Sequence, residues 1–183
     1  LMPDYEEDSE PYLALVRTIE ETDTAYERLQ KDVSFSVDGV SFYVDAPHES
    51  VYENDNNYSL ITCVTNGKNR FLLMGDAKKI RTGEFLSSAA AKEQYDLIKM
   101  PHHGIYTKNL ETLFETAKPR YAVLTADPER LRVEEETVAL LNEYECEVYY
   151  TDEGVVTAVS DGEQVQVSQT SVRPEISESI AME

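Results

Sequence analysis

Three residues that suit metal chemistry directly follow apolar, strand-like runs. Asp76 follows "RFLLMG", and the pair His102-His103 follows "DLIKMP". One helix-length segment separates the two runs, as in a right-handed crossover that brings two parallel strands side by side or nearly so. A carboxylate and imidazoles at one sheet edge suit a divalent metal such as zinc, manganese or iron. We therefore predict that Asp76, His102 and His103 lie together at the C-terminal edge of one sheet.

Each of these residues also has a simpler structural interpretation. A single Gly-Asp-Ala after a strand is more often a turn whose aspartate caps the next helix. One histidine of the pair can hydrogen-bond a carbonyl and orient the other. His48, in the polar loop "DAPHES", is interpreted as an exposed loop residue, and Asn57 and Ser59 as edge or cap residues.

The elements that must position these residues are indicated by turns and by hydrophobic periodicity. Alternating runs around Asp38-Gly39, Asn66-Gly67 and Asp161-Gly162 predict three hairpins. The rest alternates helices and strands, which predicts a mixed α/β fold with helices packed on a mixed sheet. The predicted helices are 10–22, 84–94, 108–117 and 134–144, and the predicted strands of the alternating part are 96–100, 121–125 and 146–150.

Length and composition exclude several classes of protein. The 183 residues suit one domain, predicted over 1–168 with a polar tail at 169–183. The formal net charge of -20 makes long nucleic acid and anionic membranes poor partners. No apolar run approaches the roughly 20 residues that span a bilayer, so we expect a soluble chain without membrane contact. Two cysteines, Cys63 and Cys146, in apolar runs indicate buried thiols and favour a cytoplasmic location.

Several ordered motifs resemble one family of hydrolases. An Asn-x-x-Ser strand, an apolar strand ending in Gly-Asp-Ala, a strand ending in His-His-Gly and a Thr-Asp-x-Gly turn follow one another over roughly 33–160. The order is similar to the C-terminal half of metallo-β-lactamase-fold hydrolases, in particular the branch of the ComEC/Rec2 competence protein family. Here the motifs fall at Asn56 and Ser59, at 75–77, at 102–104, and at Thr151, Asp152 and Gly154.

The resemblance implies an αββα sandwich in which a metal activates water to hydrolyse an ester or phosphodiester bond. It implies that Asp76 bridges metals and that the histidine pair supplies a further ligand, with His103 favoured over His102. The family's His-x-His-x-Asp-His motif is missing, and Ile105 replaces a serine that often follows His-His-Gly. A catalytic zinc usually takes three protein ligands, so Asp76 and the histidines make half a site.

We therefore expect the C-terminal half of a metal-dependent hydrolase, inactive alone, whose first residue, Leu1, is not a native start. Its expected partners are a small ester or phosphodiester substrate and the missing N-terminal half. A second copy of the chain, bound through the exposed sheet face, is a further expected partner. The alternative hypothesis is a non-catalytic binding or scaffolding domain that retains the fold.

Overall fold

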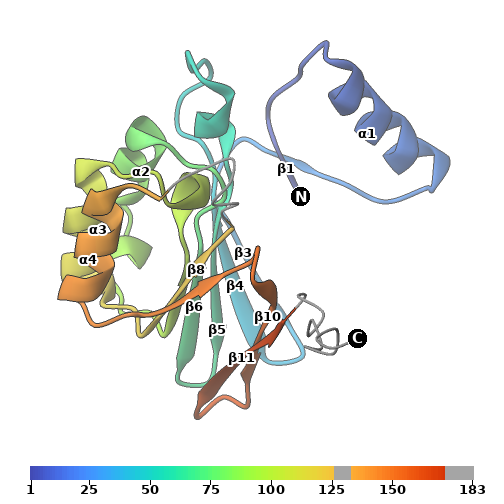
Figure 1. The fold of residues 1–183 in the computed structure, drawn as a ribbon. Coiled ribbons are helices and arrows are strands. Elements are labelled where there is room, and N and C mark those ends of the chain that lie inside the picture. Colours follow the sequence, from blue (N-terminus) through green and yellow to red (C-terminus); the bar gives the residue numbers. More distant parts are fainter. Residues whose placement is uncertain (126–132, 172–183) are drawn as a thin grey trace, which may run out of the picture.

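The computed structural model describes residues 1–125 and 133–171, and its centre is a seven-stranded mixed sheet (Figure 1). The strands lie in the order in which they occur in the chain. They are β3 (Val33–Val37), β4 (Val40–Asp45), β5 (Ile61–Asn66), β6 (Asn69–Leu73), β7 (Leu97–Lys99), β8 (Tyr121–Leu124) and β9 (Glu147–Tyr150). The mixed α/β class predicted from the sequence is confirmed.

The first half of the sheet is antiparallel because short turns join its strands. β3 and β4 form a hairpin about Asp38-Gly39, where Gly39 has a φ of 85° that L side chains rarely adopt. β5 and β6 form a second hairpin, with Asn66 paired to Asn69. β6 is the fourth of seven strands, and a central position suits its nearly continuous apolar run.

The second half of the sheet is parallel because helical crossovers connect its strands. β6, β7, β8 and β9 pair parallel to their neighbours. The crossovers carry α2 (Lys79–Phe85) with the 3₁₀ turn η2 (Ala90–Lys92), then α3 (Lys108–Ala117), then α4 (Glu135–Glu143). All three α-helices lie on one side of the sheet in Figure 1, where side chains such as Leu72, Ile98 and Phe114 form the core.

The opposite face of the sheet is covered only in part. The hairpin of β10 (Gly154–Ser160) and β11 (Val165–Ser171) packs Val165 against Leu97 and Tyr121 of the parallel strands. β11 continues through residues 169–171, which the sequence assigned to the tail; 172–183 lie outside the described residues. Toward β3 the face is open, and Phe35 remains 42% exposed.

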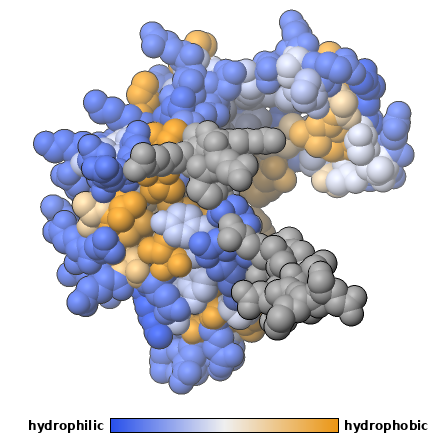
Figure 2. All heavy atoms as spheres, viewed as in Figure 1, coloured by the Kyte–Doolittle hydropathy of each residue, from blue (hydrophilic) through white to orange (hydrophobic). Residues whose placement is uncertain are grey.

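The N-terminal segment forms a small unit that packs on the end of β4 through Leu29. β1 (Met2–Pro3) pairs parallel to β2 (Arg28–Leu29), and α1 (Glu10–Glu21) connects them. Ser9 caps α1 by accepting a hydrogen bond from the Tyr12 N–H, as its position before Glu10 and Pro11 favours. No residue of α1 is buried, and Figure 2 shows apolar side chains gathered on the side of this unit nearest the sheet.

One predicted helix is wrong. The sequence indicated a helix over 84–94, but α2 begins at Lys79 and ends at Phe85, and η2 alone follows before β7. The reason is that the buried face of α2 is largely polar, with Arg81 and Thr82 beside Phe85. Its sequence therefore lacks the apolar residues at helical spacing that would predict a helix. The alanine run at 89–91 resembled a helix but forms a tight turn.

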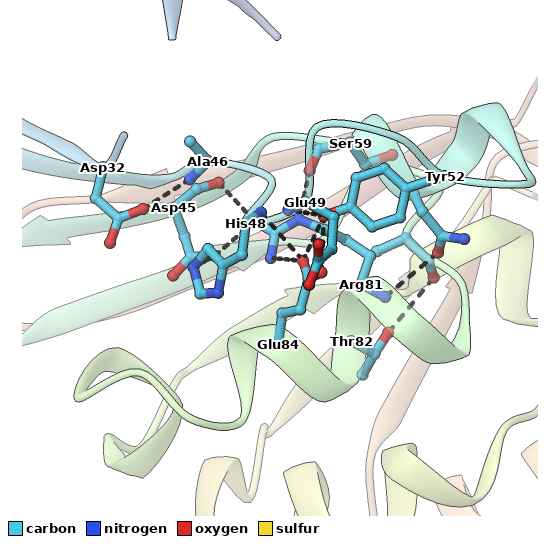
Figure 3. A network of polar contacts seen from close by, with 12 residues as sticks. Asp32, Asp45, Ala46, His48, Glu49, Tyr52, Ser59, Arg81, Thr82 and Glu84 are labelled. Carbon is cyan, nitrogen blue, oxygen red and sulfur yellow. Dashed lines mark hydrogen bonds and ion pairs between the residues drawn. The ribbon is translucent and has the colours of Figure 1, made fainter. Parts of the chain in front are cut away.

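A buried arginine fastens α2 to the sheet and to the loop before β5 (Figure 3). The side chains of Arg81 and Asp45 are both fully buried, with Arg81 Nη2 lying 2.5 Å from Asp45 Oδ1. The guanidinium also donates to the main-chain oxygens of Asp45 and Ser59 at 2.7 and 3.0 Å. Each guanidinium nitrogen thus has an acceptor, with Nη1 lying 3.4 Å from Glu84 Oε2. The buried charge is therefore compensated, and three chain segments are held together.

Replacing Arg81→Met is expected to lower the free energy of unfolding by about 3 to 5 kcal/mol, because Asp45 would stay buried without its partner. Urea denaturation measures the change, and Arg17→Met, which breaks the exposed Arg17–Glu10 pair, is the control with little expected effect. Adding Asp45→Asn to Arg81→Met should restore part of the loss. An Arg81→Met variant as stable as the Arg17→Met control would contradict this account of the buried pair.

Candidate metal centre

The candidate site lies where three neighbouring parallel strands end. The His102 N–H donates to Gly75 O at 3.2 Å, and the Met100 N–H donates to Val123 O at 2.9 Å. These bonds extend the parallel pairing of β6 with β7 and of β7 with β8 beyond the ends of β6 and β7. The residues that follow the three strands, among them Asp76, His103 and Thr125, therefore emerge at the same edge of the sheet.

The backbone turns sharply at the histidine pair. His102 and His103 have φ values of 44° and 59°, and Gly104 follows with 91°, so three successive residues are left-handed. Such a conformation costs non-glycine residues of the order of 1 kcal/mol each and persists only where the surroundings impose it. A Cβ on Gly104 would lie 2.6 Å from Leu124 Cδ2, which explains the glycine.

Thr125 fixes the orientation of the His103 ring. His103 Nδ1 lies 2.8 Å from Thr125 O and 3.0 Å from Thr125 Oγ1. A carbonyl oxygen only accepts hydrogen bonds, so Nδ1 carries the proton and donates it. In the neutral ring the lone pair is then on Nε2, which lies 3.4 Å from Asp76 Oδ2.

A lone pair that faces a carboxylate is unfavourable unless a positive charge lies between them. Either a proton on Nε2, giving an imidazolium, or a metal ion satisfies the pair. Two ligands of a tetrahedral zinc with bonds of about 2.0 to 2.1 Å are separated by about 3.3 Å. The observed 3.4 Å between Nε2 and Oδ2 is close to this separation.

Lys99 lies beside the same carboxylate and was not predicted. Its Nζ donates to Gly75 O at 2.7 Å and lies 3.4 Å from Asp76 Oδ1. Burial lowers the pKa of Lys99, and Asp76 opposes the shift. The signal in the sequence was a lysine inside the otherwise apolar strand "LIKM", since a charge there needs a partner at the strand end.

Ser59 holds the main chain of Asp76. Its Oγ accepts a hydrogen bond from the Asp76 N–H at 3.0 Å. Gly75 has a φ of 56°, and a Cβ there would lie 3.1 Å from both Ser59 Cβ and Ser59 Oγ. Ser59, interpreted from the sequence as an edge or cap residue, therefore supports the position of the candidate ligand.

His102 lies apart from the Asp76–His103 pair. Its ring centroid is 6.0 Å from that of His103, and the ring lines a pocket beside Lys78. Burial is the main cause that lowers the pKa of His102, and the Lys78 charge adds to it. Of the three predicted site residues, the structure thus brings Asp76 and His103 into one pair.

A second group of possible metal ligands lies at the other end of α2. Ligand atoms of Asp32, Asp45 and His48 lie within 4.8 Å of one another. The carboxylate of Asp45 is already paired with Arg81, and the Tyr43 hydroxyl donates to Asp32 at 2.8 Å and to Asp45 at 3.0 Å. These side chains therefore belong to the network of polar contacts around Arg81 that Figure 3 shows. His48 stays 44% exposed there, and its Nε2 lies 3.9 Å from Asp45 Oδ1.

Comparison with known proteins gives one significant relative. No protein-family profile matches the chain. Over 88 residues the chain is 32% identical to "Recombination protein 2" of Haemophilus influenzae, a similarity that covers 48% of this chain. This similarity relates the matched part of the chain to a Rec2-type protein. It spans only 11% of that relative's length.

Gly104→Ala is expected to destabilise the fold more than Gly39→Ala, because both glycines have positive φ but only Gly104 faces a close neighbour. The clash with Leu124 should add about 1 to 3 kcal/mol to the loss, as in overpacked cores. Chemical denaturation of both variants measures the difference. Equal losses would show that Leu124 moves aside without cost.

Proposed function

We propose that this chain supplies one side of a metal-dependent hydrolytic centre that cleaves an ester or phosphodiester bond, within a metallo-β-lactamase-like fold. The observation that supports it most strongly is the pairing of His103 Nε2 with Asp76 Oδ2, while Thr125 holds Nδ1. A metal-bound histidine usually donates the N–H of its other ring nitrogen to an oxygen such as a backbone carbonyl.

The donor atoms of the pair are of the kind that a divalent metal binds, but they are fewer than the three protein ligands that a catalytic zinc usually takes. Imidazole nitrogen and carboxylate oxygen suit zinc, manganese or iron. Asp76 and His103 are two ligands, and in the described part of the chain they have no third His, Cys, Asp or Glu close enough to form a cluster. We infer that the remaining ligands come from outside the present chain, which spans only 11% of the length of its Rec2-type relative.

Each residue of the chain has a defined role in this proposal. A bound metal would supply a water of lowered pKa. Asp76 and His103 would hold the metal, Thr125 keeps the His103 proton on Nδ1, and Ser59 keeps the Asp76 main chain in place. Lys99 balances the Asp76 charge when no metal is present.

A cytoplasmic location is part of the same proposal. Two free cysteines, Cys63 and Cys146, are consistent with the reducing cytoplasm. Burial raises the pKa of both thiols to about 11, so neither is an active nucleophile at neutral pH. In the described part of the chain, no helix is long and apolar enough to span a bilayer.

Zinc binding tests the proposed ligands. Calorimetric titration of the chain should show weak binding at about one equivalent, and Asp76→Asn or His103→Gln should reduce the affinity by about 10- to 100-fold. His102→Gln is the matched control and should leave the affinity nearly unchanged, because its ring lies outside the pair. Zinc affinity that survives both ligand variants would contradict the proposal, as would robust metal-dependent hydrolysis by this chain alone with Asp76→Asn in place.

The open sheet face favours a second candidate function, a binding or scaffolding domain. Four residues form one cross-strand row on this face, with Phe35 at its open end and Phe71 beside the hairpin. The row is Phe35, Phe42, Val64 and Phe71. We propose that a second copy of the chain covers this row, since apolar sheet faces bury against another layer.

Light scattering tests this second candidate. The chain should elute as a dimer or larger oligomer, and Phe35→Glu should shift it to monomer by placing a charge in the row. Val51→Glu is the control, because Val51 is 79% exposed and lies in the loop between β4 and β5, outside the row. A strictly monomeric parent chain would rule out the self-association.

A further inference from the structure

A pocket of about 360 Å³ opens beside the Asp76–His103 pair. Its walls are mainly apolar and include Ala77, Pro101 and Ile105. His102, the histidine that is not paired with Asp76, also lines it. A pocket of this size and lining suits one flat or compact organic group.

The pocket rim is positive although the protein is strongly acidic. The chain has 36 Asp and Glu against 16 Lys and Arg. Yet Lys78 and Lys79 line the pocket, no Asp or Glu is among its described lining residues, and Lys99 lies beside Asp76. Lys78 and Lys79 at the pocket and Lys99 beside Asp76 make this edge of the sheet a local attraction for anions within a repelling surface, although Glu134 lies close by and accepts from the Tyr106 N–H at 2.7 Å.

The N-terminus of α3 and an unpaired hydroxyl also favour a ligand in this pocket. α3 begins at Lys108, directly after the pocket residue Thr107, so the positive end of its dipole is adjacent to the pocket. Thr107 Oγ1 is buried and makes no hydrogen bond to any described residue. An unpaired buried hydroxyl is costly and is satisfied when a ligand or water occupies the neighbouring space.

We infer that this pocket binds the organic group of an organic phosphate, whose phosphoryl oxygens lie between the pocket and the candidate metal pair. Ile105 and Pro101 would contact the apolar group, and Lys78 would neutralise the anion. This inference deepens the proposed function, on which it rests for the role of the ligand as substrate. It assigns the specificity of the site to the 77–79 and 101–107 segments of this chain.

Binding of 1-naphthyl phosphate to the full 183-residue chain tests the inference, followed by the fluorescence anisotropy of the naphthyl group in the presence of EDTA. The phosphate ester should bind at least tenfold more tightly than 1-naphthol or, in competition, inorganic phosphate, because each lacks one half of the recognised chemistry. Lys78→Gln should weaken binding by about tenfold. Ile105→Trp, which fills the pocket, should weaken it further.

The matched control is Lys118→Gln, which removes a lysine at the opposite end of α3, about 15 Å along the helix. It should bind the ester like the parent chain. Equal affinity for the ester and for inorganic phosphate, or equal losses in Lys78→Gln and Lys118→Gln, would overturn the inference. Because the chelator removes metal, failure of zinc to bind Asp76 and His103 would overturn the proposed function alone and leave this titration readable.

Discussion

The parallel pairing of β6, β7 and β8 is the constraint on which the candidate site depends. Three strand ends at one edge bring together residues that are 27 and 22 positions apart in the chain, Asp76 with His103 and His103 with Thr125. No local structure could hold these side chains within hydrogen-bonding distance of one another. The helices on one face provide the core that keeps the three short strands aligned.

Around this edge, hydrogen bonds from separate chain segments hold Asp76 and His103 in place. Arg81 joins α2, the end of β4 and the loop before β5, and that loop carries Ser59 to the Asp76 main chain. Thr125 orients His103 from the next strand. The position of Asp76 and the tautomer of His103 are thereby set by neighbours on separate segments, as a preorganised ligand pair requires.

The sequence predicted the strands of the central sheet and of the C-terminal hairpin, and most helices, because their signals are local; the two-residue strands β1 and β2 were not predicted. α3 carries Leu110, Leu113 and Phe114 at helical spacing, and the Asp38-Gly39 turn marks its hairpin. The limits of α2 were wrong because Arg81 and Thr82 are buried through contacts with distant residues. A pattern of apolar residues cannot indicate a polar core face.

The same distinction applies to the candidate site. Asp76 and the histidine pair stood out because chemically versatile residues followed apolar runs. The separate positions of His102 and His103 depend on left-handed backbone at both residues and on the Thr125 carbonyl, which no spacing rule predicts. Lys99 interrupts an apolar run, but its contact with the end of β6 follows only from the pairing of the strands, and Ser59 carries no local signal at all.

The most direct test of the central claim is long-range ¹H–¹⁵N NMR of the imidazole nitrogens, recorded while zinc is added. The chain has three histidines, so each ring can be assigned with one variant. The account predicts that His103 is protonated on Nδ1 before zinc is added and that zinc then shifts its Nε2 while His48 and His102 change little. A response at His48 instead, or a neutral His103 ring that carries its proton on Nε2 alone and is not affected by zinc, would contradict it.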